Sequence, residues 1–185
     1  MVKDGFQAIS EEAQVILVDG QDNEIGLMGK LEAHRAGKLH RAISVFIFDC
    51  RERLLLQRRA ANKYHSAGLW TNSCCSHPSP GETPQAAAER RLQEEMGLSI
   101  PLRFAFSFRY RAPLAEGLVE HEIDHVFIGY SDEEPLINPE EASGYRWLDL
   151  AAIHREVQDN PEGYTAWFKL IYERAFRYSR SGDAQ

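Results

Sequence analysis

The sequence TPQAAAERRLQEEMG, residues 83–97, predicts the best-defined helix of the chain. Thr83 is a favoured N-cap residue, and Pro84 suits the first helical position because its missing N–H would have no partner there. Gly97 follows the last apolar residue, where helices often end in the left-handed conformation. The sequence therefore predicts a helix over residues 84–96.

This helix has an apolar face and a charged edge. Its apolar residues recur at helical spacing and are expected to face the core: Ala88, Leu92 and Met96. Arg91 and Glu95 lie four residues apart, the spacing at which opposite charges meet on a helix surface. The helix is therefore expected to present a charged pair at the border of its core contact.

Strands are predicted on both sides of the helix. Short runs of apolar and β-branched residues bounded by turn residues are typical of strands. Such runs cover residues 14–19, 25–28, 42–49, 54–58, 102–111, 118–130 and 145–148, with a hairpin between the third and fourth. Helical spacing returns at 151–157 and 165–178. This order indicates an α/β (α+β) fold, in which a mixed β-sheet is sandwiched between helices.

Length and composition fit one globular domain. The chain has 185 residues, of which 43% are hydrophobic and 26% charged. A net charge of −7 argues against a surface that coats nucleic acid or anionic membrane. No apolar run approaches the ~20 residues of a membrane span, and the charged start is unlike a secretory signal. We expect a cytoplasmic protein with an N-terminal segment (1–13), one domain (14–178) and a flexible tail (179–185).

Four segments concentrate potential metal ligands and acid–base groups. Glu120 and Glu122 lie two residues apart, so on a strand both point to one side and His121 points to the other. Like charges held together favour a cation. Three imidazoles complete a ligand set suited to Mn²⁺, Zn²⁺ or Mg²⁺: those of His34, His40 and His77. Because the segments are distant in sequence, a metal site and ordinary solvated side chains both remain open.

Cys75 lies two residues before His77, so on an extended segment both side chains face the same way and Cys74 faces the opposite way. A thiol beside a metal ligand and cations can take part in proton transfer or nucleophilic attack. Cys50 and Cys74 are interpreted as small buried hydrophobic residues.

Four basic residues come from three separate segments: Lys30, Arg59, Lys63 and Arg91. Gathered in one pocket, they would bind a compact polyanion such as a diphosphate. Scattered, they would be ordinary surface charge. The remaining residues of interest are interpreted as surface or core-edge histidines (His65, His121, His125 and His154) and packing tryptophans (Trp70 and Trp147).

Residues 76–98 resemble the Nudix box. Seven positions fall on its register: Glu82, Arg90, Leu92, Glu94, Glu95, Gly97 and Leu98. Ser76 replaces the opening glycine, and Arg91 replaces a glutamate that helps to hold Mg²⁺ in Nudix hydrolases. A box altered in this way resembles that of type I isopentenyl-diphosphate isomerases. WTNSCCSHP (70–78) is similar to the cysteine motif of that family, and FRYRA (108–112) with VEHE (119–122) to its glutamate motif.

The resemblance implies a Nudix-like single domain that interconverts isopentenyl and dimethylallyl diphosphate by adding one proton and removing another. Cys75 and Glu122 match the two catalytic residues, and Tyr110 matches a tyrosine that hydrogen-bonds in the active site. Five residues match a metal site: His34, His40, His77, Glu120 and Glu122. The interval from His34 to His40 has five residues, one fewer than the pattern expected in bacterial members.

The resemblance also implies a diphosphate site. Glu95, with the backbone carbonyl of Cys75, matches a carboxylate associated with Mg²⁺ that bridges to the diphosphate, and Trp167 matches the aromatic residue facing the cationic intermediate. The four basic residues match those around the diphosphate. We therefore expect Mg²⁺ with the substrate, a second divalent metal (Mn²⁺, Zn²⁺ or Mg²⁺) at the His/Glu site, a small allylic or homoallylic diphosphate as partner, and a monomer or homodimer.

Two other functions compete with this interpretation. A Nudix hydrolase of a nucleoside diphosphate derivative would need the box carboxylate that Arg91 replaces. A non-catalytic binding module on the same fold would leave the joint presence of Cys75 and Glu122 without a role.

Overall fold

The strand β3 (His40–Phe48) is the one on which the sheet is assembled. In the computed structural model, which describes residues 13–181, β3 forms a parallel ladder along its whole length with β8 (Val119–Tyr130). Its other edge is shared by β1 (Gln14–Val18), β6 (Cys74–Ser76) and β4 (Leu54–Arg59). A strand paired on both edges and covered on both faces favours apolar residues, which explains the buried run from Ala42 to Phe48, in which only Ser44 is polar.

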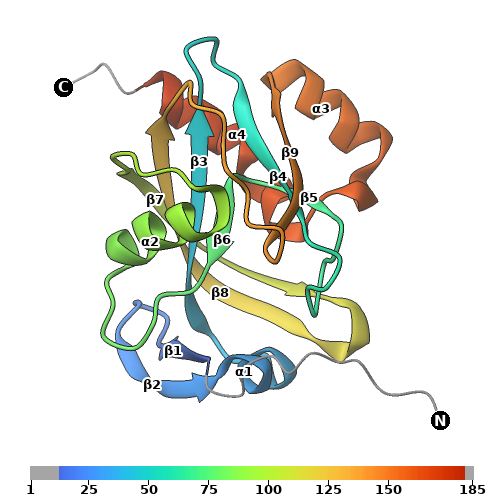
Figure 1. Cartoon of the computed structure of the whole chain (residues 1–185). Coiled ribbons are helices and arrows are strands. Elements are labelled where there is room, and N and C mark those ends of the chain that lie inside the picture. The colour runs from blue at the N-terminus through green and yellow to red at the C-terminus, as the bar shows by residue number, and fades with distance from the viewer. Residues whose placement is uncertain (1–12, 182–185) are drawn as a thin grey trace.

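The remaining strands extend this sheet (Figure 1). β2 (Glu24–Gly29) pairs with β1, β5 (Trp70–Thr71) and β9 (Ala142–Leu148) pair with β4, and β7 (Arg103–Pro113) pairs with β8. The predicted mixed sheet between helices is confirmed. The short strands β5 and β6 were not predicted.

The helices are α1 (Lys30–Ala36), α2 (Pro84–Met96), α3 (Leu150–Asp159) and α4 (Ala166–Arg180), with 3₁₀ turns η1 (Ala115–Gly117) and η2 (Pro161–Gly163). α2 begins and ends as predicted, whereas α1 was not predicted. α4 runs two residues past the expected domain end at 178, and most of the segments 1–13 and 179–185 lies outside the described residues. Within residues 13–181, no helix is long and apolar enough to cross a membrane.

The helices cover opposite faces of the sheet (Figure 1). Side chains alternate along β3, so Val45 and Ile47 pack with Leu92 of α2. Phe46 and Phe48 face the other way and pack with α4, where Phe46 stacks on Phe168. The predicted apolar stripe of α2 is confirmed, because all three of its residues are fully buried. The α4 face is where the candidate site lies.

The predicted hairpin between β3 and β4 is closed only at its base. Phe48 pairs with Leu54, after which the strands diverge and β6 pairs with β3 instead. The hydroxyl of Ser73 accepts the N–H of Ile47 at 2.9 Å and donates to the carbonyl of Leu55 at 2.7 Å. One side chain thus replaces the missing ladder bonds and leaves room for the strand that carries Cys75.

The three cysteines are free. Cys74 is fully buried, as predicted, and packs in the core beneath α2. The prediction for Cys50 is wrong, because this residue is exposed. It lies in the turn after β3, where its backbone N–H donates to the carboxylate of Asp132. That polar turn has no apolar side to bury a thiol against.

Candidate functional site

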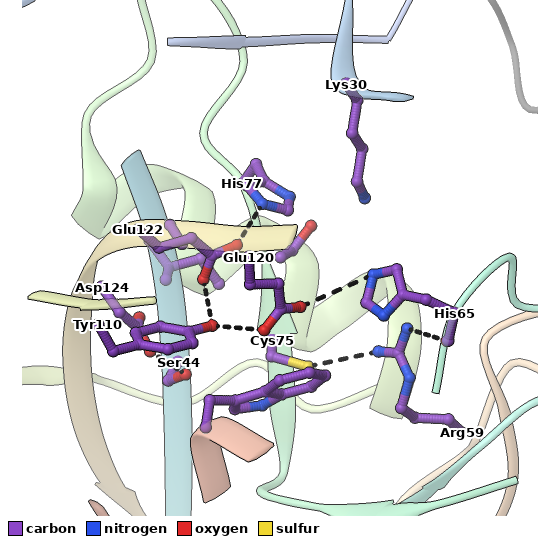
Figure 2. Close-up of a pocket in the computed structure, with 14 residues that line it drawn as sticks. Lys30, Ser44, Arg59, His65, Cys75, His77, Tyr110, Glu120, Glu122 and Asp124 are labelled. Carbon is purple, nitrogen blue, oxygen red and sulfur yellow. Dashed lines mark hydrogen bonds and ion pairs between the residues drawn. The ribbon is translucent and has the colours of Figure 1, made fainter. Parts of the chain in front are cut away.

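Two carboxylates point to the same side of β8 and are bridged by a phenol. Glu120 and Glu122 are almost fully buried, and Tyr110 lies opposite Glu122 on β7. The Tyr110 hydroxyl lies 2.8 Å from Glu120 and 2.6 Å from Glu122, as Figure 2 shows. Burial and the neighbouring charge of Glu122 raise the pKa of Glu120 well above its usual range. The predicted carboxylate pair therefore exists, and the phenol links its two members.

Three histidines from separate segments converge on this pair. His34 comes from α1, His40 from β3, and His77 directly follows β6. One ligand atom from each of these and from Glu122 lies within 4.8 Å of every other. The Nε2 atoms of His40 and His77 are 3.3 Å and 3.0 Å from the same oxygen of Glu122. The shorter interval between His34 and His40 does not keep the two rings apart, since their centroids are 4.8 Å from each other.

The protonation of these rings fits a bound cation. The Nδ1 atoms of His34 and His40 lie 2.7 Å and 2.8 Å from the backbone carbonyls of Lys30 and Lys38. A carbonyl only accepts, so each Nδ1 carries the hydrogen and, in the neutral ring, each Nε2 is a bare lone pair. Burial, and then repulsion from His40, lower the pKa of His34 to about 4, which keeps that ring neutral. Its Nε2 is buried and has no partner within residues 13–181. Lone pairs converging on a carboxylate make a buried site that is able to hold a metal ion.

His65 belongs to this site, although it was predicted to be a surface or core-edge residue. It is buried, lies 3.8 Å from Glu120 and stacks against His34 at 5.7 Å between ring centroids. Burial and the nearby cations, Arg59 first, lower its pKa to about 2. His34, His65 and Glu120 form a second group, in which one possible ligand atom from each residue lies within 4.8 Å of the others. His65 lies on an irregular loop after β4, so no periodic pattern pointed to it.

The Cys75 side chain extends from β6 into the cavity that Glu120, Glu122 and His77 also line. As predicted, it faces the way His77 does, and Cys74 faces the α2 core. An Arg59 N–H donates to the Cys75 sulfur at 3.6 Å (Figure 2). Burial raises the pKa of Cys75 to about 12, against the opposing effect of Arg59. The sulfur is therefore a neutral thiol that carries a proton.

Two neighbouring cavities have Cys75 in their walls. We call the first the inner chamber; its walls include Tyr110, Glu120, Glu122, Asp124 and Trp167. We call the second the outer cleft; its volume is about 560 Å³ and its walls include Lys63, Arg91, Glu95 and Glu141. Lys30, Arg59, Cys75 and Ser76 line both. The thiol therefore lies at the boundary between the outer cleft and the much smaller inner chamber, whose volume is about 30 Å³.

The structure brings the four basic residues together around the outer cleft. Burial, followed by repulsion from Arg59, Lys63 and Arg91, lowers the pKa of Lys30 to about 8. The Lys30 side chain extends toward the chamber from α1 (Figure 2). Such concentrated positive charge in an acidic protein favours a polyanionic ligand.

Glu95 comes from α2, on the other face of the sheet, and also lines the outer cleft. One oxygen accepts from Arg91 at 2.7 Å, so the predicted charged pair is confirmed. The other accepts from Gln57 at 2.9 Å. The Glu95 side chain is only 2% exposed, and these two donors satisfy its buried carboxylate.

Trp167 closes the inner chamber from the first turn of α4. It is 3% exposed, and its indole N–H donates to Asn72 at 3.2 Å. The Arg59 guanidinium lies 5.4 Å from the ring centroid. Trp70 and Trp147 are packing residues, as predicted. His121, His125 and His154 lie outside both cavities; His121, for example, faces the carbonyl of Gly37.

Further residues line or support these cavities without having been predicted, among them Ser44, Gln57, Asp124 and Glu141. The two-residue period of β8 contains a signal for Asp124, because it continues the face of Glu120 and Glu122. Ser44 donates to Asp124 at 2.7 Å. Gln57 and Glu141 carry no such signal, since their places depend on how distant segments pack.

Comparison with known proteins agrees with this architecture. The NUDIX domain family matches residues 38–168. A crystal structure of DR0079 from Deinococcus radiodurans superposes with a TM-score of 0.73 at 21% identity, covering 86% of this chain and 98% of that one. The MutT protein from Methanosarcina mazei gives a TM-score of 0.62, also at 21% identity, over 78% and 96% of the two chains. The chain is therefore a Nudix-domain protein.

Comparison of sequences points to one family of enzymes among the Nudix-domain proteins. The chain is 54% identical to isopentenyl-diphosphate Delta-isomerase 2 of Aromatoleum aromaticum over 88% of its length and 86% of the relative's. It is 52% identical to the isopentenyl-diphosphate Delta-isomerase of Pectobacterium atrosepticum, covering 87% and 90%. The corresponding Streptomyces griseus enzyme is 46% identical over 90% and 85%. The chain belongs to the type I isopentenyl-diphosphate Delta-isomerase family.

Proposed function

We propose that the inner chamber and outer cleft are the active site of the family reaction, with Cys75 and Glu122 as its two proton-transfer residues. The chain isomerises isopentenyl diphosphate to dimethylallyl diphosphate. One observation carries the assignment of residues: Cys75 and Glu122 line one buried chamber from strands on opposite edges of β3. Adding a proton at one carbon and removing one at another needs two groups on different sides of the substrate, and this arrangement supplies them.

Tyr110 acts on the Glu122 side. Its hydroxyl hydrogen-bonds both carboxyl groups of the pair, so it fixes the orientation of the Glu122 carboxylate beside the substrate. The imidazoles of His40 and His77 confine the other oxygen of Glu122. Glu122 therefore has little freedom to rotate, which favours proton transfer at one defined position.

A divalent cation (Mn²⁺, Zn²⁺ or Mg²⁺) fits the His/Glu cluster. His34, His40, His77 and Glu122, whose ligand atoms converge, would hold it, on the evidence of the bare lone pairs described above. Glu120, the fifth residue of the predicted set, lies beside them in a group with His34 and His65. Its chemical contribution is positive charge, which keeps a buried carboxylate ionised and fixed in place.

The diphosphate end is assigned to the outer cleft, where Lys30, Arg59, Lys63 and Arg91 supply positive charge. Glu95 and the Cys75 carbonyl would hold the Mg²⁺ that accompanies the diphosphate. Contacts made there, remote from the reacting carbons, supply binding energy that places the alkene between its proton donor and acceptor.

Trp167 is assigned to the cationic intermediate. Protonation of an alkene produces a tertiary carbocation that water would trap, so the chamber must exclude water without offering a nucleophile. An indole face meets both needs, and its attraction for a desolvated cation is worth ~2 kcal/mol.

The substrate partner is thus a small allylic or homoallylic diphosphate, processed by a monomer or a homodimer. We place the protein in the cytoplasm, because a reducing compartment keeps Cys75 as the thiol that the reaction needs.

Proton NMR of isopentenyl diphosphate with the protein and Mg²⁺ in D₂O tests the proposal. We expect deuterated dimethylallyl diphosphate without phosphate release. Cys75→Ala and Glu122→Gln should abolish turnover with the fold intact, whereas Cys50→Ala, which removes an exposed thiol far from the chamber, should leave it unchanged. Near-normal turnover in Cys75→Ala would overturn the role of the thiol.

Arg91→Glu distinguishes isomerisation from hydrolysis, because it restores the carboxylate of the Nudix box. We expect weaker diphosphate binding and little phosphate release, since neither Cys75 nor Glu122 is assigned to activate water for attack on phosphorus. Efficient hydrolysis by this variant would contradict the assigned roles.

A further inference from the structure

The outer cleft holds a carboxylate where positive charge is expected to receive a diphosphate. Glu141, at the end of the segment that joins β8 to β9, forms ion pairs with Lys63 and with Arg91, the latter at 3.0 Å. Its side chain is 20% exposed. A negative charge in this place repels a phosphate, so its presence calls for a compensating role.

The backbone of Glu141 is fixed to both walls of the cleft. Its N–H donates to the carbonyl of Asn138 at 2.9 Å, and its own carbonyl accepts from Ala60 at 3.0 Å. The N–H of Asn138 in turn donates to the carbonyl of Glu95 at 2.9 Å. The segment is therefore tied to the end of α2 on one side and to the loop after β4 on the other.

The two partners of Glu141 reach the cleft on long side chains. Lys63 lies in an irregular loop, and its ammonium ends a flexible four-carbon chain. Arg91 also pairs with Glu94 at 2.6 Å and Glu95 at 2.7 Å, but Glu94 is largely exposed. If Glu95 turns to a cation that accompanies the diphosphate, Glu141 is the less exposed of the two remaining partners of Arg91, with 20% against 43% for Glu94.

We propose that Glu141 is a positioning residue, which holds Lys63 and Arg91 in the geometry that receives the diphosphate of the substrate. The inference rests on the proposed diphosphate site. Its expected gain comes from preorganisation: the two cations are oriented before the substrate arrives, so less conformational entropy is lost on binding. This gain must exceed the repulsion between Glu141 and the phosphate.

Glu140 provides a matched control. It lines the same cleft and carries the same charge, but its side chain forms no ion pair within residues 13–181. Glu140→Gln and Glu141→Gln therefore make the same change in net charge, and only the second removes an ion pair from each of Lys63 and Arg91. A purely electrostatic role predicts that both variants bind the diphosphate more tightly.

Steady-state kinetics with isopentenyl diphosphate and Mg²⁺ provide the test. We expect Glu141→Gln to raise KM about tenfold, with kcat within about threefold of the parent, the size of effect typical of a lost charge-assisted contact. Competitive inhibition by inorganic pyrophosphate should weaken by the same factor. Glu140→Gln should leave KM and pyrophosphate inhibition unchanged or slightly stronger. Glu141→Asp, which keeps the charge on a shorter side chain, should recover part of the affinity.

Three results would overturn the inference: a lower KM in Glu141→Gln, equal effects in Glu140→Gln, or a fall in kcat with KM unchanged. Lys63→Ala separates this outcome from failure of the proposed function. If Lys63→Ala raises KM and Glu141→Gln does not, only the role of Glu141 fails. If neither changes KM, the diphosphate is not bound by Lys63 and the proposed site fails as well. Should Glu141→Gln not fold, Glu141→Asp still decides the matter, because a parent-like KM despite the shortened reach would exclude a positioning role.

Discussion

The Tyr110 hydroxyl is the single group that joins the two carboxyls of the pair. Tyr110→Phe removes it and leaves Glu120 and Glu122 buried without that partner. We expect kcat to fall about 100-fold, in the range of a lost acid–base contribution, while the metal content stays the same because no ligand is removed. Kinetics and metal analysis check both points. Tyr145→Phe, which removes a hydroxyl from exposed Glu134, is the control. A fall in metal content equal to the fall in kcat would contradict the assignment.

Glu141 also makes a prediction about pH that does not depend on activity. Although burial acts to raise its pKa, the hydrogen bond from Lys63 and the charge of Arg91 lower it from 4.5 to about 2. A folded-state pKa below the unfolded value means that the stabilisation is present above about pH 4.5 and is lost as the pH falls toward 2. Because solvent reaches part of this ion pair and screens it, the contribution at neutral pH is about 1 kcal/mol.

Urea unfolding of the parent and of Glu141→Gln at pH 7 and pH 2.5 measures this contribution. The parent should be the more stable protein at pH 7, and the difference should shrink toward zero in acid. A difference that is independent of pH would show that the carboxylate is not paired in solution.

Among the elements, β3 and β4 are bridged by the hydroxyl of Ser73, just before β6, at the point where the two strands diverge. Ser73→Ala leaves the N–H of Ile47 and the carbonyl of Leu55 without their partner in a buried position. We expect a loss of about 2–4 kcal/mol in the free energy of unfolding, because two buried polar groups become unsatisfied. Urea denaturation measures it. Ser143→Ala, whose hydroxyl makes longer contacts of 3.3–3.4 Å at the surface, should lose less than about 0.5 kcal/mol. Equal losses would contradict the bridging role of Ser73.

The elements that could be predicted from sequence are those with local signals. The ends of α2 follow from Thr83 and Gly97, which act through their nearest neighbours, and the structure shows the Thr83 side chain accepting from Ala86. By contrast, α1 has Gly29 at its N-cap, which offers no side chain to cap it, and has only seven residues, so packing of Ala33 and His34 stabilises it. The strand β6 has three residues and exists because β3 offers it an edge. Tertiary contacts decide such short elements, and a local pattern does not contain them.

The same distinction separates the predicted from the unpredicted parts of the site. The two-residue period of β8 is enough to place Glu120 and Glu122 on one side, and the Cys75 motif is recognisable from its neighbours. Distances between segments are not encoded locally, so the convergence of the histidines needed either the family resemblance or the structure. His65 and Glu141 lie in or beside irregular loops, where no period relates a residue to the cavity it faces.

At the scale of the whole molecule, the His/Glu cluster joins four segments that no single hydrophobic cluster unites. His34, His40, His77 and Glu122 come from α1, β3, the end of β6 and β8. A cation bound by all four would cross-link the small β1–β2–α1 end of the sheet to its centre. Metal binding should therefore stabilise the entire domain as well as the active site.

Removal of the metal tests this connection. Because a ligand that binds only the folded state adds about 2.7 kcal/mol at a hundredfold excess over its Kd, treatment with a chelator should lower Tm by about 5–10 °C in a domain of this size. Scanning calorimetry before and after chelation measures the change, and added Mn²⁺ or Zn²⁺ should reverse it. In His34→Ala the response to metal should largely disappear, whereas His154→Ala, which changes an exposed histidine on α3, should respond as the parent does. A parent protein that binds the metal without any rise in Tm would contradict this prediction, because it would show that the metal binds the unfolded chain as well as it binds the folded cluster.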